Sequence, residues 1–187
     1  MLDLLLQGQI TLFVTIMAAI IISLTFHEFG HAFTAYLYGD NTAQRAGRLT
    51  LNPMAHIDPM GLLMVALIGF GYAKPVPTNP NNFRSVWASL FVSAAGPGMN
   101  LLIAIVAINF FVLGQANGWS ITQGQGAQVF FVYLALINLI LMLFNLIPIG
   151  ALDGHYILPY FLPKHLAQSY RVWNQRYGNY FLLGLIL

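Results

Sequence analysis

The sequence contains no cysteine and very few charges. Charged residues make up only 6% of its 187 positions, with seven Lys and Arg against five Asp and Glu. Soluble proteins average about 25% charged residues. Without thiolates, a bound metal must be held by imidazole or carboxylate groups. So few basic residues also exclude a surface that tracks nucleic-acid phosphates, and we expect no nucleic-acid partner.

Hydrophobic residues, by contrast, form 58% of the chain and fall into long runs. Three runs, at about 10–38, 86–113 and 127–149, reach the roughly 20 helical residues that cross a bilayer. The sequence therefore predicts an all-α polytopic membrane protein, with a single domain over residues 1–187 and the lipid bilayer as its surroundings.

Two further apolar runs are shorter. The run at 60–72 lies between Asp58-Pro59 and Lys74-Pro75, and its length suits a re-entrant segment over about 60–77 better than a crossing. The run that ends the sequence, about 179–187, covers about half a bilayer at 1.5 Å per residue. We expect it to be the start of a further helix that the end of the sequence truncates.

The basic residues test the topology, because cytoplasmic loops collect Lys and Arg. If the run at 60–72 does not cross, all seven basic residues lie on one side of the membrane. They are Arg45, Arg48, Lys74, Arg84, Lys164, Arg171 and Arg176. A crossing at 60–72 would divide them between the two sides. We therefore expect this side to be cytosolic and the N-terminus to lie outside.

A metal motif occurs inside the first predicted span. His27 and His31 flank the only glutamate of the chain, Glu28, in the pattern His-Glu-x-x-His. On a helix this spacing lets both imidazoles bind one Zn²⁺ while the glutamate reaches the bound water. Ionisable residues within a span are also costly and usually functional. The alternative is a pair of buried histidines that hydrogen-bond to the backbone or to each other.

Zinc bound by two histidines needs a third protein ligand. Asp153 follows the third span, where Pro148 and Gly150 would break the helix, and the favoured topology places it toward the same face as the two histidines. His155 is the competing ligand, because imidazole suits zinc at least as well. As a further alternative, Asp153-Gly154 is an ordinary turn.

Several other short motifs lie along about residues 25–158. They are the loop 49–61 with Asn52-Pro53 and Asp58-Pro59, Ala73-Lys74-Pro75-Val76-Pro77, Asn79-Pro80, Gly96-Pro97-Gly98-Met99-Asn100, and Asn145 with Pro148 and Asp153-Gly154. Together with the His-Glu-x-x-His motif they resemble the site-2 protease family, in its short bacterial and archaeal form without PDZ or CBS domains. Two positions differ from many members: Gly150 stands where they have a proline and His155 where they have a glycine.

This resemblance implies an intramembrane zinc metalloprotease with a three-helix catalytic core in a prokaryotic cytoplasmic membrane. One zinc ion per chain would be held by His27, His31 and Asp153, with Glu28 as the catalytic base. The substrate would be a transmembrane protein, cut in regulated proteolysis or in clearance of membrane stubs, at a site open toward the cytosol.

Two asparagines lie within the predicted spans. Polar groups there suggest a buried function, and we predict that Asn145 and Asn100 bind substrate, with a bridge between helices as the alternative. A rival function is a zinc-binding transporter or sensor without hydrolysis, although such a site needs no glutamate beside the first histidine. The other rival is an inactive relative that serves as a scaffold.

Overall fold

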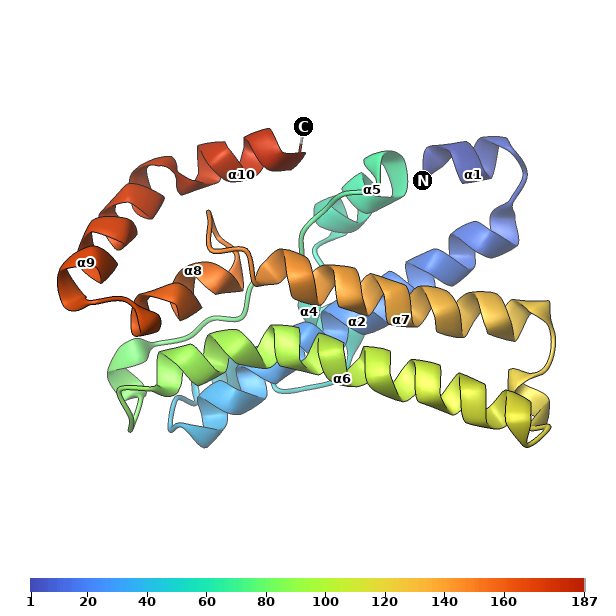
Figure 1. Cartoon of the computed structure of the whole chain (residues 1–187), viewed down its shortest axis with the longest axis horizontal. Helices are drawn as coiled ribbons and strands as arrows, with labels where there is room; N and C mark the ends of the chain where they lie inside the picture. The colour runs from blue at the N-terminus through green and yellow to red at the C-terminus, as the bar shows by residue number, and fades with distance from the viewer. Residues whose placement is uncertain (187) are drawn as a thin grey trace.

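A computed structural model describes residues 1–186, and Leu187 lies outside the described residues. Figure 1 shows three long helices lying side by side, with shorter helices at one end and along one side. The α-helices are α1 (Leu2–Leu6), α2 (Ile10–Leu37), α3 (Thr42–Arg45), α4 (Pro53–His56), α5 (Pro59–Ile68), α6 (Ala88–Ala116), α7 (Gln125–Asn145), α8 (Asp153–Ile157), α9 (Lys164–Trp173) and α10 (Asn179–Ile186).

The three long helices α2, α6 and α7 are each long and apolar enough to cross a membrane. This confirms the all-α polytopic class. Helix α6 packs against both α2 and α7, and the centre of the bundle contains Ala19, Ala107, Leu134 and Ala135. Alanines let helix backbones approach closely, which is how helices associate in a membrane.

The third long helix ends earlier than the sequence predicts. Helix α7 stops at Asn145 rather than at Ile149. Pro148 has no N–H to donate to the carbonyl of Phe144, and its ring disfavours a helical conformation at Ile147. Gly150 then takes a positive φ of 61°. The chain therefore leaves the bundle in a turn over residues 146–152.

The predicted re-entrant segment forms a short helix followed by an extended return. Helix α5 has 10 residues and would reach only about half of a 30 Å hydrocarbon layer. An isolated antiparallel bridge then joins Ile57 to Ala73, and Lys74 N donates to the His56 carbonyl at 2.8 Å. Because its two ends are hydrogen-bonded together, the segment returns to the level where it starts.

The C-terminal part turns across one end of the bundle. Helix α9 stands at the left of Figure 1, and α10 turns back along the side. A π-helical turn, Asn174–Gly178, joins the two helices. The helix predicted from residue 179 is confirmed over Asn179–Ile186, while the last residue of the predicted range, Leu187, lies outside the described part.

Candidate metal centre

The His-Glu-x-x-His residues lie in the second half of α2. His27 and Glu28 are buried and His31 is half-buried. The spacing of four residues places both histidines on one face, with ring centroids 4.7 Å apart. Since α2 ends at Leu37, His31 lies roughly 9 Å from the end of the helix. The motif therefore lies within the apolar helix rather than at its end.

Helix α6 fixes both imidazole rings. His27 Nδ1 lies 2.6 Å from Asn100 Oδ1, and His31 Nδ1 lies 2.7 Å from the Val92 carbonyl oxygen. Both partners are acceptors, so each Nδ1 carries the proton and each Nε2 presents a lone pair. Gly96 lies against the rings, and any side chain there would overlap them. Helix α6 thus sets the tautomer that a metal ligand requires.

Asp153 reaches the same point from a distant part of the sequence. It is the first residue of α8, after the turn that ends α7. Asp153 Oδ2 lies 3.3 Å from His27 Nε2, and Asp153 Oδ1 lies 3.3 Å from His31 Nε2. The two Nε2 atoms are 3.1 Å apart. Asp153 Oδ2 is buried and has no hydrogen-bond partner among the described residues.

These donor atoms fit a zinc ion. Tetrahedral zinc with bonds of about 2.0–2.1 Å separates neighbouring ligand atoms by roughly 3.3 Å, and the observed separations are 3.1 to 3.3 Å. Two facing lone pairs and a carboxylate repel one another unless a cation lies between them. In the described part of the chain, His27, His31 and Asp153 are the one group of this kind.

Comparison with known proteins agrees with this geometry. The family model described as peptidase family M50 matches residues 15–124 and 114–187. The chain belongs to peptidase family M50. It is 39% identical over 171 residues to a Bacillus subtilis protein named "Putative zinc metalloprotease YwhC", and the alignment covers 90% of this chain and 77% of that protein.

Two mycobacterial proteins named "Putative zinc metalloprotease Rip2" are also similar. The one from Mycolicibacterium smegmatis is 32% identical over 167 residues, covering 84% of this chain and 61% of that protein. The one from Mycobacterium tuberculosis is 32% identical over 185 residues, covering 94% of this chain and 67% of that protein. No solved structure matches the chain significantly. Membership of M50, the family of site-2 proteases, makes this protein a zinc metalloprotease and confirms the expected cofactor.

A network of buried polar side chains holds His27, the first histidine of this M50 protease, in place. Asn100 is 0% exposed, and its Nδ2 donates to Asn138 Oδ1 at 2.8 Å and to the Ser23 carbonyl at 3.3 Å. Asn138 Nδ2 donates to Ser23 Oγ at 2.7 Å. The Asn100 amide thus bonds to His27, Ser23 and Asn138, which is the bridge between helices named as the alternative, and its contact with substrate stays a prediction. Sequence reasoning misses Asn138 and Ser23, although a polar residue within a span is itself a signal.

The second asparagine predicted to bind substrate behaves differently. Asn145 is half-buried at the end of α7, and its Nδ2 donates to the Leu141 carbonyl of the same helix at 2.9 Å. This bond lies within one helix, so it does not bridge α7 to a neighbour. The role of Asn145 toward a substrate stays a prediction.

The competing third ligand lies outside the cluster. His155 Nδ1 is 3.3 Å from the Tyr170 hydroxyl. Burial, together with the nearby positive charge of Arg171, lowers the pKa of the His155 imidazole. In the described part of the chain, Asp153 and not His155 lies together with His27 and His31.

Arg48, which the sequence analysis uses only in the count of basic residues on one side, is buried beside the re-entrant segment. Its guanidinium donates to the Pro75 carbonyl at 3.0 Å and to the carbonyl of Lys74. Burial lowers the pKa of Arg48, and the negative charge of Glu28 partly opposes this effect. Arg48 therefore binds the backbone of the extended segment and also lies close enough to Glu28 to interact with its charge.

Asp40 fastens the following loop to the end of α2. It is fully buried and accepts hydrogen bonds from the Thr42 hydroxyl at 2.5 Å, from Asn79 N at 2.6 Å and from Asn82 Nδ2 at 2.9 Å. Burial by itself would raise the pKa of the Asp40 carboxyl, but these hydrogen bonds outweigh burial and lower the pKa below its usual range. The ionised carboxylate thus determines where the re-entrant segment rejoins the bundle.

Proposed function

We propose that this metalloprotease is an intramembrane endopeptidase that hydrolyses peptide bonds in or near the transmembrane segments of other proteins. One observation carries the proposal: the donor atoms of Asp153, from α8, converge on those of His27 and His31, which lie within α2, an apolar helix long enough to span a bilayer. A protease for soluble substrates has no reason to place its metal there. The partner is thus a membrane protein whose cleaved segment lies in the same bilayer.

The residues divide the chemistry among them. Zinc, when held by His27, His31 and Asp153, supplies a Lewis acid that polarises the scissile carbonyl and activates a water molecule. Glu28 accepts the proton of the attacking water and passes it to the nitrogen of the leaving amine. Its neighbourhood supports this role, because Glu28 is buried beside His27 and forms no salt bridge in the described part of the chain.

The extended segment after α5 supplies a place for an unwound substrate. A helical peptide bond is shielded by its own hydrogen bonds, so the substrate must become extended and can pair with a free backbone edge. Pro75 and Pro77 have no N–H, and Arg48 occupies the carbonyls of Lys74 and Pro75. Val76 N–H makes no hydrogen bond among the described residues. We therefore expect substrate pairing to centre on Val76.

The site faces the cytosolic side of a prokaryotic cytoplasmic membrane in this proposal. The positive-inside rule supports the orientation, because all seven basic residues fall on one side if the segment at 60–77 does not cross the membrane. Ala46 lies near the end of α2 that is close to the metal centre, and Gly118 lies at the opposite end of the bundle, after α6. Both are exposed. Single cysteines at these positions, treated with a membrane-impermeant thiol reagent on intact cells, should label Gly118→Cys and spare Ala46→Cys. The opposite pattern would invert the orientation.

The catalytic proposal is tested with Glu28→Gln in purified, zinc-loaded protein and a single-span model substrate. We expect cleavage to fall by about 10²–10⁴-fold, because an amide cannot accept the proton, while the zinc content stays at one per chain. Asp3→Asn, which makes the same chemical change at an exposed position, is the matched control and should leave cleavage unchanged. Near-normal cleavage by Glu28→Gln would overturn the role of Glu28 and return the non-hydrolytic transporter to consideration.

A further inference from the structure

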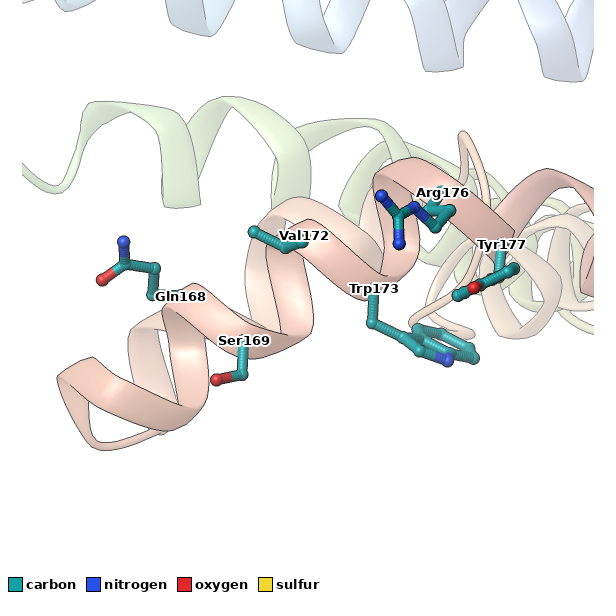
Figure 2. A pocket seen from close by; sticks show the side chains of 6 residues that line it. All are labelled: Gln168, Ser169, Val172, Trp173, Arg176 and Tyr177. Carbon is teal, nitrogen blue, oxygen red and sulfur yellow. The ribbon is translucent and has the colours of Figure 1, made fainter.

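Helix α9 and the π-helical turn after it have two unlike faces. One face is outward and carries Gln168, Ser169, Val172, Trp173, Arg176 and Tyr177, which Figure 2 shows along the helix and the turn. The other face carries Ala167 and Asn174, both buried, and the half-buried Tyr170. None of these inward residues belongs to the metal centre. The polar groups on the inward face therefore need a reason for their burial.

Those polar groups bind the backbone of the turn that precedes Asp153. Asn174 Oδ1 accepts from Gly150 N at 2.8 Å, and Asn174 Nδ2 donates to the Gly150 carbonyl at 2.9 Å. One turn of helix earlier, the Tyr170 hydroxyl donates to the Pro148 carbonyl at 2.6 Å. Three hydrogen bonds thus hold the backbone over residues 148–150, three to five positions before Asp153. We call Tyr170 and Asn174, with these bonds, the turn clamp.

The local backbone is shaped for this clamp. Gly150 has a positive φ of 61°, a conformation that favours glycine. Gly178, in the π-helical turn, lies so close that a side chain there would overlap Asn174 Oδ1. A π-helical turn is rare and is found mostly at functional sites. Here it brings the backbone of residues 174–178 against the backbone of Gly150.

We propose that Tyr170 and Asn174 are positioning residues that hold Asp153 in place as the third metal ligand. The inference rests on the proposed function, because it takes His27, His31 and Asp153 as the ligand set. The histidines are rigid parts of a long helix, whereas Asp153 stands after an irregular turn of seven residues, 146–152, with no side-chain hydrogen bond of its own on Oδ2. The turn clamp removes the freedom that this segment would otherwise have. The C-terminal helices thereby support the metal centre, although none of their residues belongs to it.

The test compares Asn174→Ala with Tyr177→Ala, which removes an exposed side chain from the same turn. Both proteins are purified with zinc, and zinc release to a chelator is timed. Replacement of supporting residues around metal ligands costs about 10–100-fold in affinity, and we expect about tenfold faster release from Asn174→Ala and wild-type release from Tyr177→Ala. The Co²⁺-substituted proteins give a second readout, since the visible absorption of Co²⁺ reports the ligand geometry. It should change for Asn174→Ala alone.

A milder variant covers the case in which Asn174→Ala fails to fold. Tyr170→Phe removes one hydroxyl and keeps the ring, so release should quicken by several-fold with the thermal midpoint nearly unchanged. Wild-type zinc release and Co²⁺ absorption in both Asn174→Ala and Tyr170→Phe would overturn the proposal.

The double variant separates the clamp from the ligand assignment. If Asn174 acts through Asp153, then Asn174→Ala should add nothing to the zinc loss already caused by Asp153→Asn. An additional loss in the double variant would show that Asn174 acts elsewhere and would overturn the positioning role. Full zinc retention by Asp153→Asn alone would instead overturn the ligand set of the proposed function, which is a different failure.

Discussion

The two halves of the metal centre are built in different ways. His27 and His31 are fixed by the period of a single helix, α2, and their rings are held by one neighbouring helix, α6. Asp153 follows a helix break, and the turn before it is held by hydrogen bonds from residues 20 or more positions later in the chain. The helix half is thus local and rigid, while the turn half depends on tertiary contacts.

This difference predicts how each half of the metal centre responds to amino-acid substitutions. A helix keeps its two ligands in register even when neighbouring helices shift, because the spacing comes from backbone hydrogen bonds. A turn keeps its ligand only while every contact that shapes it survives. We expect substitutions near the histidines to act by crowding the imidazole rings or by changing their tautomer. Substitutions near Asp153 should act by making the turn before it more mobile.

Gly96→Ala should have the largest effect, because it would break the helix half. The added methyl group would overlap the His27 and His31 rings, and displacement of a reacting group by about 1 Å can cost 10²-fold in rate. We expect zinc affinity to fall and cleavage to fall by about 10²-fold or more. Gly98→Ala, on the same helix with open space around it, is the control. Normal zinc affinity in Gly96→Ala would contradict the close packing of α6 on the rings.

Asn100→Leu weakens the same half without crowding it. Loss of the acceptor for His27 Nδ1 leaves the ring free to adopt the wrong tautomer, and we expect zinc affinity to fall by about 10–100-fold. Competition with a chelator measures the affinity, and ¹⁵N chemical shifts of the imidazoles report the tautomer in the zinc-free protein. Asn109→Leu, which loses only a bond within the exposed part of α6, should retain the wild-type affinity.

Asp40 sharpens the comparison, because it fastens a third region that holds no ligand. Its pKa in the folded protein is lowered, so the stabilisation is complete above about pH 3.9, the ordinary value for Asp, and is lost as the pH falls through the lower folded value. We expect Asp40→Asn to cost about 1–2 kcal/mol at pH 7 and the difference from wild type to shrink below pH 4. Thermal unfolding at a series of pH values measures this. A difference that is constant with pH would contradict an ionised carboxylate at this position.

Asn145→Ala should have the smallest effect on the fold. The variant tests whether a residue next to the turn also binds the substrate. Among the described residues, the Asn145 side chain makes one hydrogen bond, to its own helix, so its loss should cost less than about 1 kcal/mol. If the side chain binds the substrate backbone, KM should rise several-fold while zinc content and thermal midpoint stay unchanged. An unaltered KM would remove Asn145 from the substrate-binding residues.

The sequence predicts the helix half well because its signal is local. Apolar runs of sufficient length show α2, α6 and α7, and the spacing of His27 and His31 needs only a helical period. The sequence also favours Asp153 as a ligand, because the favoured topology places the C-terminal ends of the first and third spans on the same side of the membrane. These inferences depend on short stretches of sequence or on simple counts of charge.

The supporting contacts are not predictable in the same way. Tyr170, Asn174 and Arg48 act on backbone carbonyls and amides, and nothing in the identity of the bound residue records such a contact. Helix α7 ends at Asn145, before the predicted end of the apolar run, because Pro148 disfavours the helical conformation of the residues that precede it. The burial of Asn100 depends on Asn138 and Ser23 from two other helices, which only the packed structure brings together.

The shared amide network of α2, α6 and α7 also bears on how the protein is assembled after insertion. Ser23, Asn100 and Asn138 each come from a different helix, and hydrocarbon offers no water to a polar group left without a partner. Two of these helices can satisfy only part of the network, since Asn100 needs both Ser23 and Asn138 for its donors. Of the three helices α7 is synthesised last, so one donor of Asn100 stays without its partner Asn138 until α7 arrives. Biogenesis should therefore lead to a cooperative joining of three helices, and a chain stopped before residue 138 should be a preferred target of membrane quality control.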